Sequence, residues 1–173
     1  MTPIRLTATA ALILAGLGAA ATAQDAPDTG PAPLVAHVAG PDGTPMGEVH
    51  ATPTPSGVMH LTIRLTGLPE GTLGVHIHET GACAPDFGAA GGHLADGRPH
   101  GIGAEGGPHP GDLPNLHVPA SGEITVEYFA PLLTRELMTD ADGSAFIVHE
   151  HADDYATQPT GDAGGRLACG VFE

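Results

Sequence analysis

The sequence contains no lysine and no tryptophan, and only four phenylalanines and two tyrosines occur among its 173 residues. Its five basic side chains are all arginines, and they face 20 acidic residues, so the net charge is −15 with neutral histidines. A surface of this charge repels nucleic acids and anionic membranes, because both carry negative phosphate groups. The composition therefore argues against both as partners and indicates solubility without indicating an activity.

Long apolar runs are absent after the first 20 residues. Met1–Arg5 is short and weakly positive, residues 7–20 are apolar, and Ala21-Thr22-Ala23 fits a cleavage site before Gln24. This is the pattern of a secretory signal peptide. The alternative, a membrane anchor, needs about 20 apolar residues, which is more than this run supplies. We therefore expect a signal peptide over residues 1–23 and no membrane association after its removal.

The mature chain of 150 residues is long enough for one domain around one hydrophobic core. Residues 24–33 are rich in Pro, Asp and Gly, so we expect a flexible N-terminus there and the folded domain over residues 34–173. The two cysteines, Cys83 and Cys169, would meet an oxidising compartment, where pairing is the usual outcome. Two free thiols, or a metal site built on both cysteines, are the alternatives.

Short runs of alternating apolar and polar residues, separated by Gly, Pro and Asp, predict β-strands. The predicted strands are residues 34–38, 47–54, 58–66, 73–78, 124–129 and 144–149. No run has sustained helical periodicity, so the pattern favours an antiparallel sandwich or barrel. The segments 79–115 and 150–165 are polar and long for loops of a compact domain, and loops of this length are usually functional or disordered.

Histidine is unusually abundant, with 11 residues. His76 and His78 alternate along a predicted strand, so both side chains point to the same face. The first long loop adds three histidines and an aspartate, a complete tetrahedral set for zinc, namely His93, His100, His109 and Asp112. His149 ends the last of the predicted strands. Imidazole suits copper and zinc alike, so the histidines predict a metal site.

Five segments resemble the signature sequences of the copper,zinc superoxide dismutases. They are GVHIHE (74–79), GGH (91–93), HPGDLPN (109–115), VHE (148–150) and GRLACG (165–170). They occur in the family's order, and the resemblance extends over residues 34–171. Cys83 lies five residues after His78 and the second loop is short, and both features resemble the bacterial, periplasmic branch of the family.

The resemblance implies an all-β fold, an eight-stranded antiparallel Greek-key barrel or sandwich that carries the two long loops. It implies that copper is bound by His76, His78, His93 and His149. It implies that zinc is bound by His93, His100, His109 and Asp112. His93 belongs to both sets and would bridge the two metals as an imidazolate, which two cations together can stabilise.

The resemblance also assigns roles outside the ligand sets. Cys83 and Cys169 match the disulfide that tethers the first loop, and Asp153 matches the carboxylate that joins a copper ligand to a zinc ligand. Arg166 matches the catalytic arginine that attracts the anion. The implied reaction converts superoxide to dioxygen and hydrogen peroxide, with a redox-cycling copper, a structural zinc and His93 as proton carrier. This activity would protect the periplasm from superoxide.

Some positions depart from the family pattern. His93 and His100 are seven residues apart, one fewer than is typical, so His100 is the least secure of the expected zinc ligands. Thr80 replaces a common aromatic residue, and Asp162 replaces the usual asparagine. The literal match to a nucleotide-binding glycine motif at residues 101–106 neither follows a strand nor opens a helix, so we do not interpret it as a nucleotide site.

Two other functions are compatible with parts of the sequence. A dismutase-like domain could bind copper or zinc without turnover, but such a chain would be expected to lose a copper ligand, the bridging histidine or the arginine. A structural or adhesive β-sandwich would leave the complete ligand set unexplained. The remaining histidines are expected to be solvated, namely His37, His50, His60, His117 and His151. The sequence does not distinguish a monomer from a homodimer.

Overall fold

The computed structural model describes residues 31–173, so the predicted signal peptide and most of the predicted N-terminal segment lie outside the described residues. The elements of the described part, in chain order, are β1 (Leu34–Ala39), β2 (Pro45–Pro53), β3 (Met59–Leu65), β4 (Gly71–Leu73), β5 (Val75–His78), the 3-10 turn η1 (Phe87–Ala90), β6 (Leu116–Val118), β7 (Ile124–Ala130), α1 (Arg135–Met138), β8 (Ala145–His149) and β9 (Arg166–Val171). None of the helices among these residues has the length and apolar character that crossing a membrane requires.

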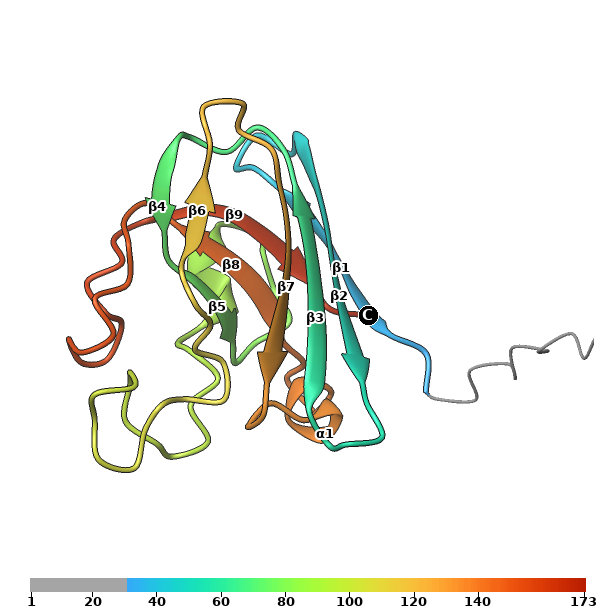
Figure 1. The fold of residues 1–173 in the computed structure, drawn as a ribbon. Helices are drawn as coiled ribbons and strands as arrows, with labels where there is room; N and C mark the ends of the chain where they lie inside the picture. The colour runs from blue at the N-terminus through green and yellow to red at the C-terminus, as the bar shows by residue number, and fades with distance from the viewer. Residues whose placement is uncertain (1–30) are drawn as a thin grey trace, which may run out of the picture.

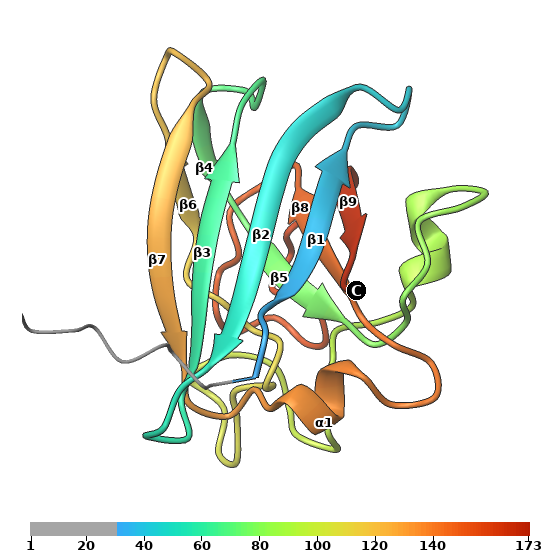
Figure 2. The same cartoon turned by 90° about the vertical axis from the view of Figure 1, so that its right-hand side faces the viewer.

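Seven strands form one curled antiparallel sheet in the order β5-β8-β9-β1-β2-β3-β7, and β4 pairs with β6 in a second, small sheet (Figures 1 and 2). Neighbours that are distant in sequence, such as β3 and β7 or β9 and β1, show that the chain crosses over rather than winding back and forth. The predicted all-β antiparallel fold is confirmed. The two long loops emerge on the same side of the sheet, on the left in Figure 1.

The described chain has nine strands rather than eight, because the predicted strand 73–78 is divided at Gly74. Before Gly74 the chain pairs with β6, and after it the chain pairs with β8. The two strands that no run of alternation predicted, β6 and β9, are a three-residue segment and a segment containing Cys169 and Gly170. Helix α1 is a single turn, too short for any periodicity, and begins where the Thr134 side chain accepts a hydrogen bond from Leu137 N–H at 3.3 Å.

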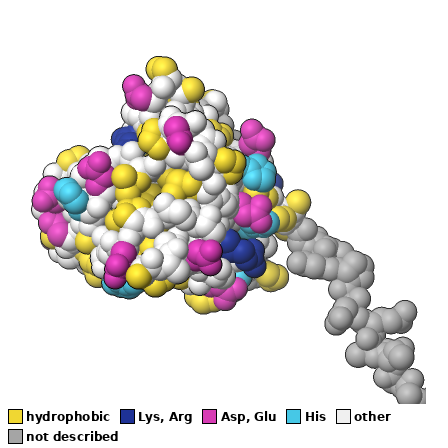
Figure 3. All heavy atoms as spheres, turned by 90° about the horizontal axis from the view of Figure 1, so that it is seen from above, with side chains coloured by type: hydrophobic (Ala, Val, Ile, Leu, Met, Phe, Trp, Pro, Cys, Tyr) yellow, Lys and Arg dark blue, Asp and Glu magenta, His cyan; other side chains and the backbone are white. Residues whose placement is uncertain are grey.

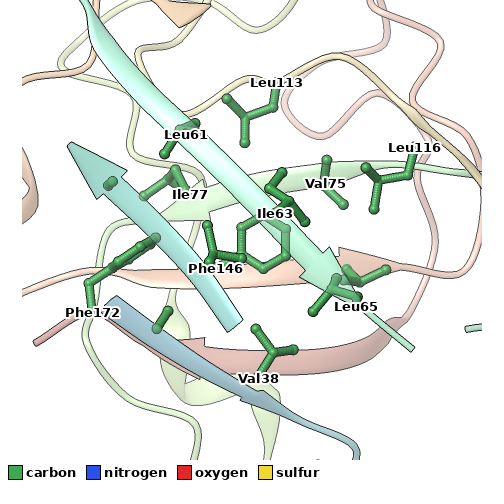
Figure 4. Close-up of a cluster of buried hydrophobic side chains, with 14 of the residues drawn as sticks. Val38, Leu61, Ile63, Leu65, Val75, Ile77, Leu113, Leu116, Phe146 and Phe172 are labelled. Atoms are coloured by element: carbon green, nitrogen blue, oxygen red, sulfur yellow. The ribbon is translucent and has the colours of Figure 1, made fainter. Parts of the chain in front are cut away.

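The core is mostly aliphatic, as the scarcity of aromatic residues requires. The alternation predicted for β3 is confirmed, because the side chains of Leu61, Ile63 and Leu65 are buried while Arg64 is exposed. These side chains meet residues of β5 and β8, among them the fully buried Phe146 (Figure 4). Each buried side chain of this size contributes roughly 1.5–3 kcal/mol, so the core holds β5 and β8 rigidly beneath the two loops.

The first long loop is tied to the sheet by a disulfide. Cys83 in the loop is bonded to Cys169 in β9, across a sequence separation of 86 residues, so the expected pairing is confirmed. A crosslink that closes a loop of this length stabilises a protein by about 4 kcal/mol in the chain-entropy model. The bond therefore anchors one end of the loop beside the strand that begins with Arg166.

Candidate metal centre

The first long loop runs beside β5 and pairs with it through backbone hydrogen bonds. Leu94 N–H donates to the Ile77 carbonyl at 2.9 Å, and Ile77 N–H donates to the Gly111 carbonyl at 2.9 Å. A Cβ atom at position 111 would overlap the Ile77 carbonyl, so only glycine allows this close approach. The pairing brings His93 and Asp112 beside the two histidines of β5.

Four histidines from three segments converge in the first of two groups. One nitrogen of each ring lies within 4.8 Å of the others, and the four residues are His76, His78, His93 and His149. All four are buried. The Nε2 atoms of His78 and His149 are 3.3 Å apart. Strand β5 supplies two histidines on one face, β8 supplies its last residue, and the loop supplies the fourth.

Backbone carbonyls fix the ring orientation of two of these histidines. His78 Nδ1 lies 3.0 Å from the Gly91 carbonyl oxygen, and His149 Nδ1 lies 3.3 Å from the Gly164 carbonyl oxygen. A carbonyl only accepts, so each Nδ1 carries the proton and donates it. The Nε2 lone pairs of both rings therefore face the centre of the group, in the form that binds a metal.

The second group is built around one carboxylate. The Nδ1 atoms of His93, His100 and His109 lie 3.1, 3.0 and 3.1 Å from Asp112 Oδ1. The other carboxylate oxygen, Asp112 Oδ2, accepts hydrogen bonds from the backbone N–H groups of Gly101 and His109, at 2.9 and 3.0 Å. Three imidazoles and one carboxylate are a suitable tetrahedral set for zinc.

His93 belongs to both groups, and its two ring nitrogens face opposite sides. Its Nδ1 lies in the Asp112 group, while its Nε2 is buried without a hydrogen-bond partner among the described residues, as is Nδ1 of His76. A buried polar atom left unpaired costs about 1–3 kcal/mol. Two such nitrogens among four converging imidazoles fit a bound metal ion that would use both lone pairs. The residues present therefore fit two metal ions that share His93.

One buried carboxylate, that of Asp153, bonds to one histidine of each group. Asp153 Oδ2 accepts a hydrogen bond from His76 Nε2 at 2.8 Å, and Asp153 Oδ1 accepts one from His100 Nε2 at 3.0 Å. Burial alone would raise the pKa of Asp153, but the hydrogen bonds from His76 and from Tyr155 N–H outweigh it and lower the pKa. The carboxylate is therefore ionised at neutral pH and keeps the Nδ1 lone pairs of both rings turned towards the two groups.

The local environment keeps the candidate ligands in their metal-binding forms. Burial lowers the pKa of His76 to about 4, of His78 to about 2 and of His149 to about 3. Burial alone would raise the pKa of Asp112, but hydrogen bonds from His93 and from Gly101 N–H outweigh it and lower the pKa. At neutral pH the three imidazoles are neutral and the carboxylate is charged, which are the states that bind metals.

Arg166, the first residue of β9, lies next to the four-histidine group. Its guanidinium donates hydrogen bonds to the carbonyls of Phe87 and Gly91, and the Gly91 carbonyl also accepts from His78. Burial lowers the pKa of the Arg166 guanidinium, and the opposite effect of the nearby Asp86 carboxylate is smaller. A pocket lined partly by Asp86, Phe87 and Arg166 lies beside the guanidinium, and none of the four histidines lines this pocket.

The structure thus brings every residue of the two expected ligand sets together, and Asp153 contacts both groups. Two residues with no assigned role bond to residues of the site: Gln158 bonds to the backbone of His100, a member of the second group, and Asn115 bonds to the backbone of Asp153. Asn115 lies in one of the signature segments, whereas no pattern in the sequence points to Gln158. The other five histidines lie outside both groups.

Comparison with known proteins agrees with this geometry. The family model for copper/zinc superoxide dismutase (SODC) matches residues 46–172. A copper-zinc superoxide dismutase of Caulobacter vibrioides is 42% identical over 141 residues, which cover 76% of this chain and 80% of the relative. A copper-zinc superoxide dismutase of Aquifex aeolicus is 36% identical over 139 residues, which cover 76% of this chain and 81% of the relative.

Solved structures match the fold. A superoxide dismutase-like protein from Bacillus subtilis has a TM-score of 0.73 at 37% identity, and the match covers 79% of this chain and 96% of that one. The copper/zinc superoxide dismutase of Brucella abortus has a TM-score of 0.68 at 32% identity, covering 80% and 98%. With sequence and fold in agreement over most of its length, this chain belongs to the copper/zinc superoxide dismutase family.

Proposed function

We propose that this chain dismutates superoxide in the periplasm with one copper and one zinc ion. In this proposal the copper ligands are His76, His78, His93 and His149. The zinc ligands are His93, His100, His109 and Asp112. The observation that supports the proposal most directly is the position of His93. One of its ring nitrogens faces each group, and each group contains all four of its expected ligands.

The reaction converts two superoxide ions and two protons to one dioxygen and one hydrogen peroxide. Copper held by the four histidines would supply the electron transfer, because it alternates between Cu(II) and Cu(I). His93 takes up one proton at Nε2 in the first half-reaction and donates it to the reduced product in the second, and the other proton of hydrogen peroxide comes from solvent. Its Nδ1 stays within the Asp112 group throughout, so the ring keeps its position while Nε2 gains and loses the proton.

Arg166 binds the substrate in this proposal. Its guanidinium is positively charged, lies beside His78 through their shared contact with Gly91, and borders an open pocket. The same two carbonyl contacts hold the side chain in one orientation, which reduces the entropy lost when the anion binds. Arg166 therefore directs superoxide to the four-histidine group, next to the proton carried by His93.

The place of action follows from the N-terminal pattern. We propose cleavage after Ala23, a mature chain that starts at Gln24, and a dismutase domain over residues 34–173. The disulfide between Cys83 and Cys169 supports export, because such bonds persist in oxidising compartments. N-terminal sequencing of the protein recovered from the periplasm tests the cleavage site. Sedimentation of the same sample distinguishes a monomer from the homodimer that the sequence leaves open.

Metal content and turnover, measured together, test the proposed function. We expect the protein reconstituted with both metals to contain one copper and one zinc per chain and to dismutate superoxide rapidly. Bound copper and zinc without turnover would refute dismutation and favour a metal-binding protein. Copper without zinc would show that His100, in its shortened loop, does not complete the zinc site.

We expect only a weak dependence of the rate on ionic strength. The mature chain carries 20 acidic residues against four arginines, and acidic side chains are scattered over the face seen in Figure 3. Of the three other arginines of the mature chain, Arg98 and Arg135 bond to the carbonyls of Gly106 and Ala32, and Arg64 is exposed on β3. Arg166 shares the Gly91 carbonyl with His78 and is therefore the arginine beside the four-histidine group. Salt shortens the screening length from about 30 Å at 0.01 M to about 8 Å at 0.15 M. A fall in kcat/KM over this range as steep as in lysine-rich relatives would contradict the prediction.

A further inference from the structure

Two side-chain amides join the long loops, and each one pairs with both backbone groups of a single residue in the metal centre. Gln158, in the second loop, accepts a hydrogen bond from His100 N–H at Oε1 (2.8 Å) and donates from Nε2 to the His100 carbonyl (2.7 Å). The same Nε2 also donates to the Ala156 carbonyl at 3.2 Å, which orients the amide within its own loop. His100 is therefore held from the opposite loop through its backbone.

Asn115, at the end of the first loop, makes the matching contact in the other direction. Its Oδ1 accepts from Asp153 N–H, and its Nδ2 donates to the Asp153 carbonyl, both at 2.9 Å. The backbone of Asn115 is itself fixed, because its N–H donates to the Tyr155 hydroxyl (2.8 Å) and its carbonyl accepts from the Tyr128 hydroxyl (3.1 Å). Tyr128 belongs to β7, so this contact connects Asp153 to the rigid sheet.

The two residues held by these amides also contact each other. His100 and Asp153, the residues whose backbones the amides hold, are bonded to each other through His100 Nε2 and Asp153 Oδ1 at 3.0 Å. Little free space remains there, because a Cβ atom at Gly161 would overlap the Asp153 carboxylate and come within 2.7 Å of His100 Nε2. The two loops are thus connected through the backbone of His100, the backbone of Asp153 and the hydrogen bond between the side chains of these two residues.

The spacing of the ligands explains why such support is needed. Only six residues separate His93 from His100, and this segment contains no regular strand or helix. Its own hydrogen bonds within the loop include Arg98 N–H to the Ala95 carbonyl, but no backbone contact with the sheet fixes His100. The backbone of His100 instead bonds to Gln158, which lies 58 residues later.

We propose that Gln158 is the positioning residue for His100 and that Asn115 is the positioning residue for Asp153. This inference rests on the proposed assignment of His100 to zinc. It assigns the second loop a part in zinc binding, although that loop contributes no zinc ligand. Because Asp153 also bonds to His76, Asn115 supports both groups, whereas Gln158 supports only the Asp112 group.

The test compares zinc affinity in three forms of the mature protein. Gln158→Met removes both amide contacts at similar volume, and Thr160→Ala is the matched control, since Thr160 is an exposed residue of the same loop. Partners that hold a metal ligand typically change affinity 10- to 100-fold when they are lost. We expect zinc affinity, measured by chelator competition, to fall about tenfold in Gln158→Met. Copper affinity in Gln158→Met and zinc affinity in Thr160→Ala should be unchanged.

Two further readouts separate positioning from a general loss of stability. Co(II) bound in the zinc site should show an altered visible spectrum in Gln158→Met, and Asn115→Leu should weaken copper as well as zinc. Unchanged zinc affinity and spectrum, or a fall confined to the stability of the metal-free protein, would overturn the proposal. Should Gln158→Met fail to fold, Gln158→Glu replaces it, since it keeps the oxygen that accepts from His100. None of these measurements depends on dismutase activity. A protein that binds zinc as expected but does not dismutate superoxide would therefore refute the proposed function without refuting this inference.

Discussion

Replacing His149 with alanine is expected to remove copper and abolish dismutation while zinc binding is retained. His149 is the last residue of β8, and its Nε2 lies 3.3 Å from Nε2 of His78 in the four-histidine group. It makes no contact with Asp112, around which the second group is built. The variant therefore loses a ligand on one side of His93 only, and activity should fall to the background rate. Metal analysis and superoxide dismutation of the reconstituted variant measure both effects.

His117→Ala is a suitable control for this experiment. His117 is an exposed strand histidine whose Nδ1 lies 3.1 Å from the Thr72 hydroxyl, and it belongs to neither group. Its loss should change neither metal content nor turnover. Full activity in His149→Ala would show that the four-histidine group is not the copper site, and loss of zinc as well would show that the two groups do not bind independently.

Acidification is expected to destabilise the metal-free protein steeply below pH 6.5. The folded pKa values of about 4, 2 and 3 for His76, His78 and His149 lie below the unfolded value of about 6.5. Between these values the unfolded chain binds protons that the folded chain does not, so the free energy of unfolding decreases as the pH falls. Each histidine contributes about 1.4 kcal/mol per pH unit. Because the three rings lie in one cluster and lower one another's affinity for protons, this is an upper limit for each ring, and we expect a loss of a few kcal/mol between pH 6 and pH 5.

The carboxylates act in the same direction at lower pH. The pKa values of Asp112 and Asp153 are lowered in the folded state, so their stabilising contribution is lost as the pH falls below the unfolded value of about 3.9. Urea unfolding of the metal-free protein at pH 7.5, 6 and 5, with the disulfide intact, measures the effect. The zinc-loaded protein is the control, because a ligand that binds only the folded state stabilises it. Equal stability at pH 7.5 and pH 5 would contradict the prediction.

Local patterns in the sequence predicted most strands of the sheet, though not β9, and part of the metal centre. Strict alternation in residues 58–66 predicted which face of β3 is buried, because successive side chains of a strand point to opposite faces. The same rule placed His76 and His78 on one face of β5, where both contribute to the four-histidine group. Alternation could not reveal that the strand changes partner at Gly74, since pairing depends on β6 and β8, which are distant in sequence.

The ligand sets, and Asp153 as the carboxylate between them, were predicted from the resemblance of sequence segments to the family's signatures, whereas the contacts that hold His100 and Asp153 in place were decided by the tertiary structure. The chain's own sequence carries the histidines, the aspartates and the two cysteines. The shared contact of Asp153 with both groups, and the support of His100 by Gln158, arise only when loops 79–115 and 150–165 meet on the sheet. The physical reason is the distance along the sequence over which each feature is determined. Strand periodicity is a local property of neighbouring residues, while a loop without periodicity takes its position from hydrogen bonds to groups that lie tens of residues away.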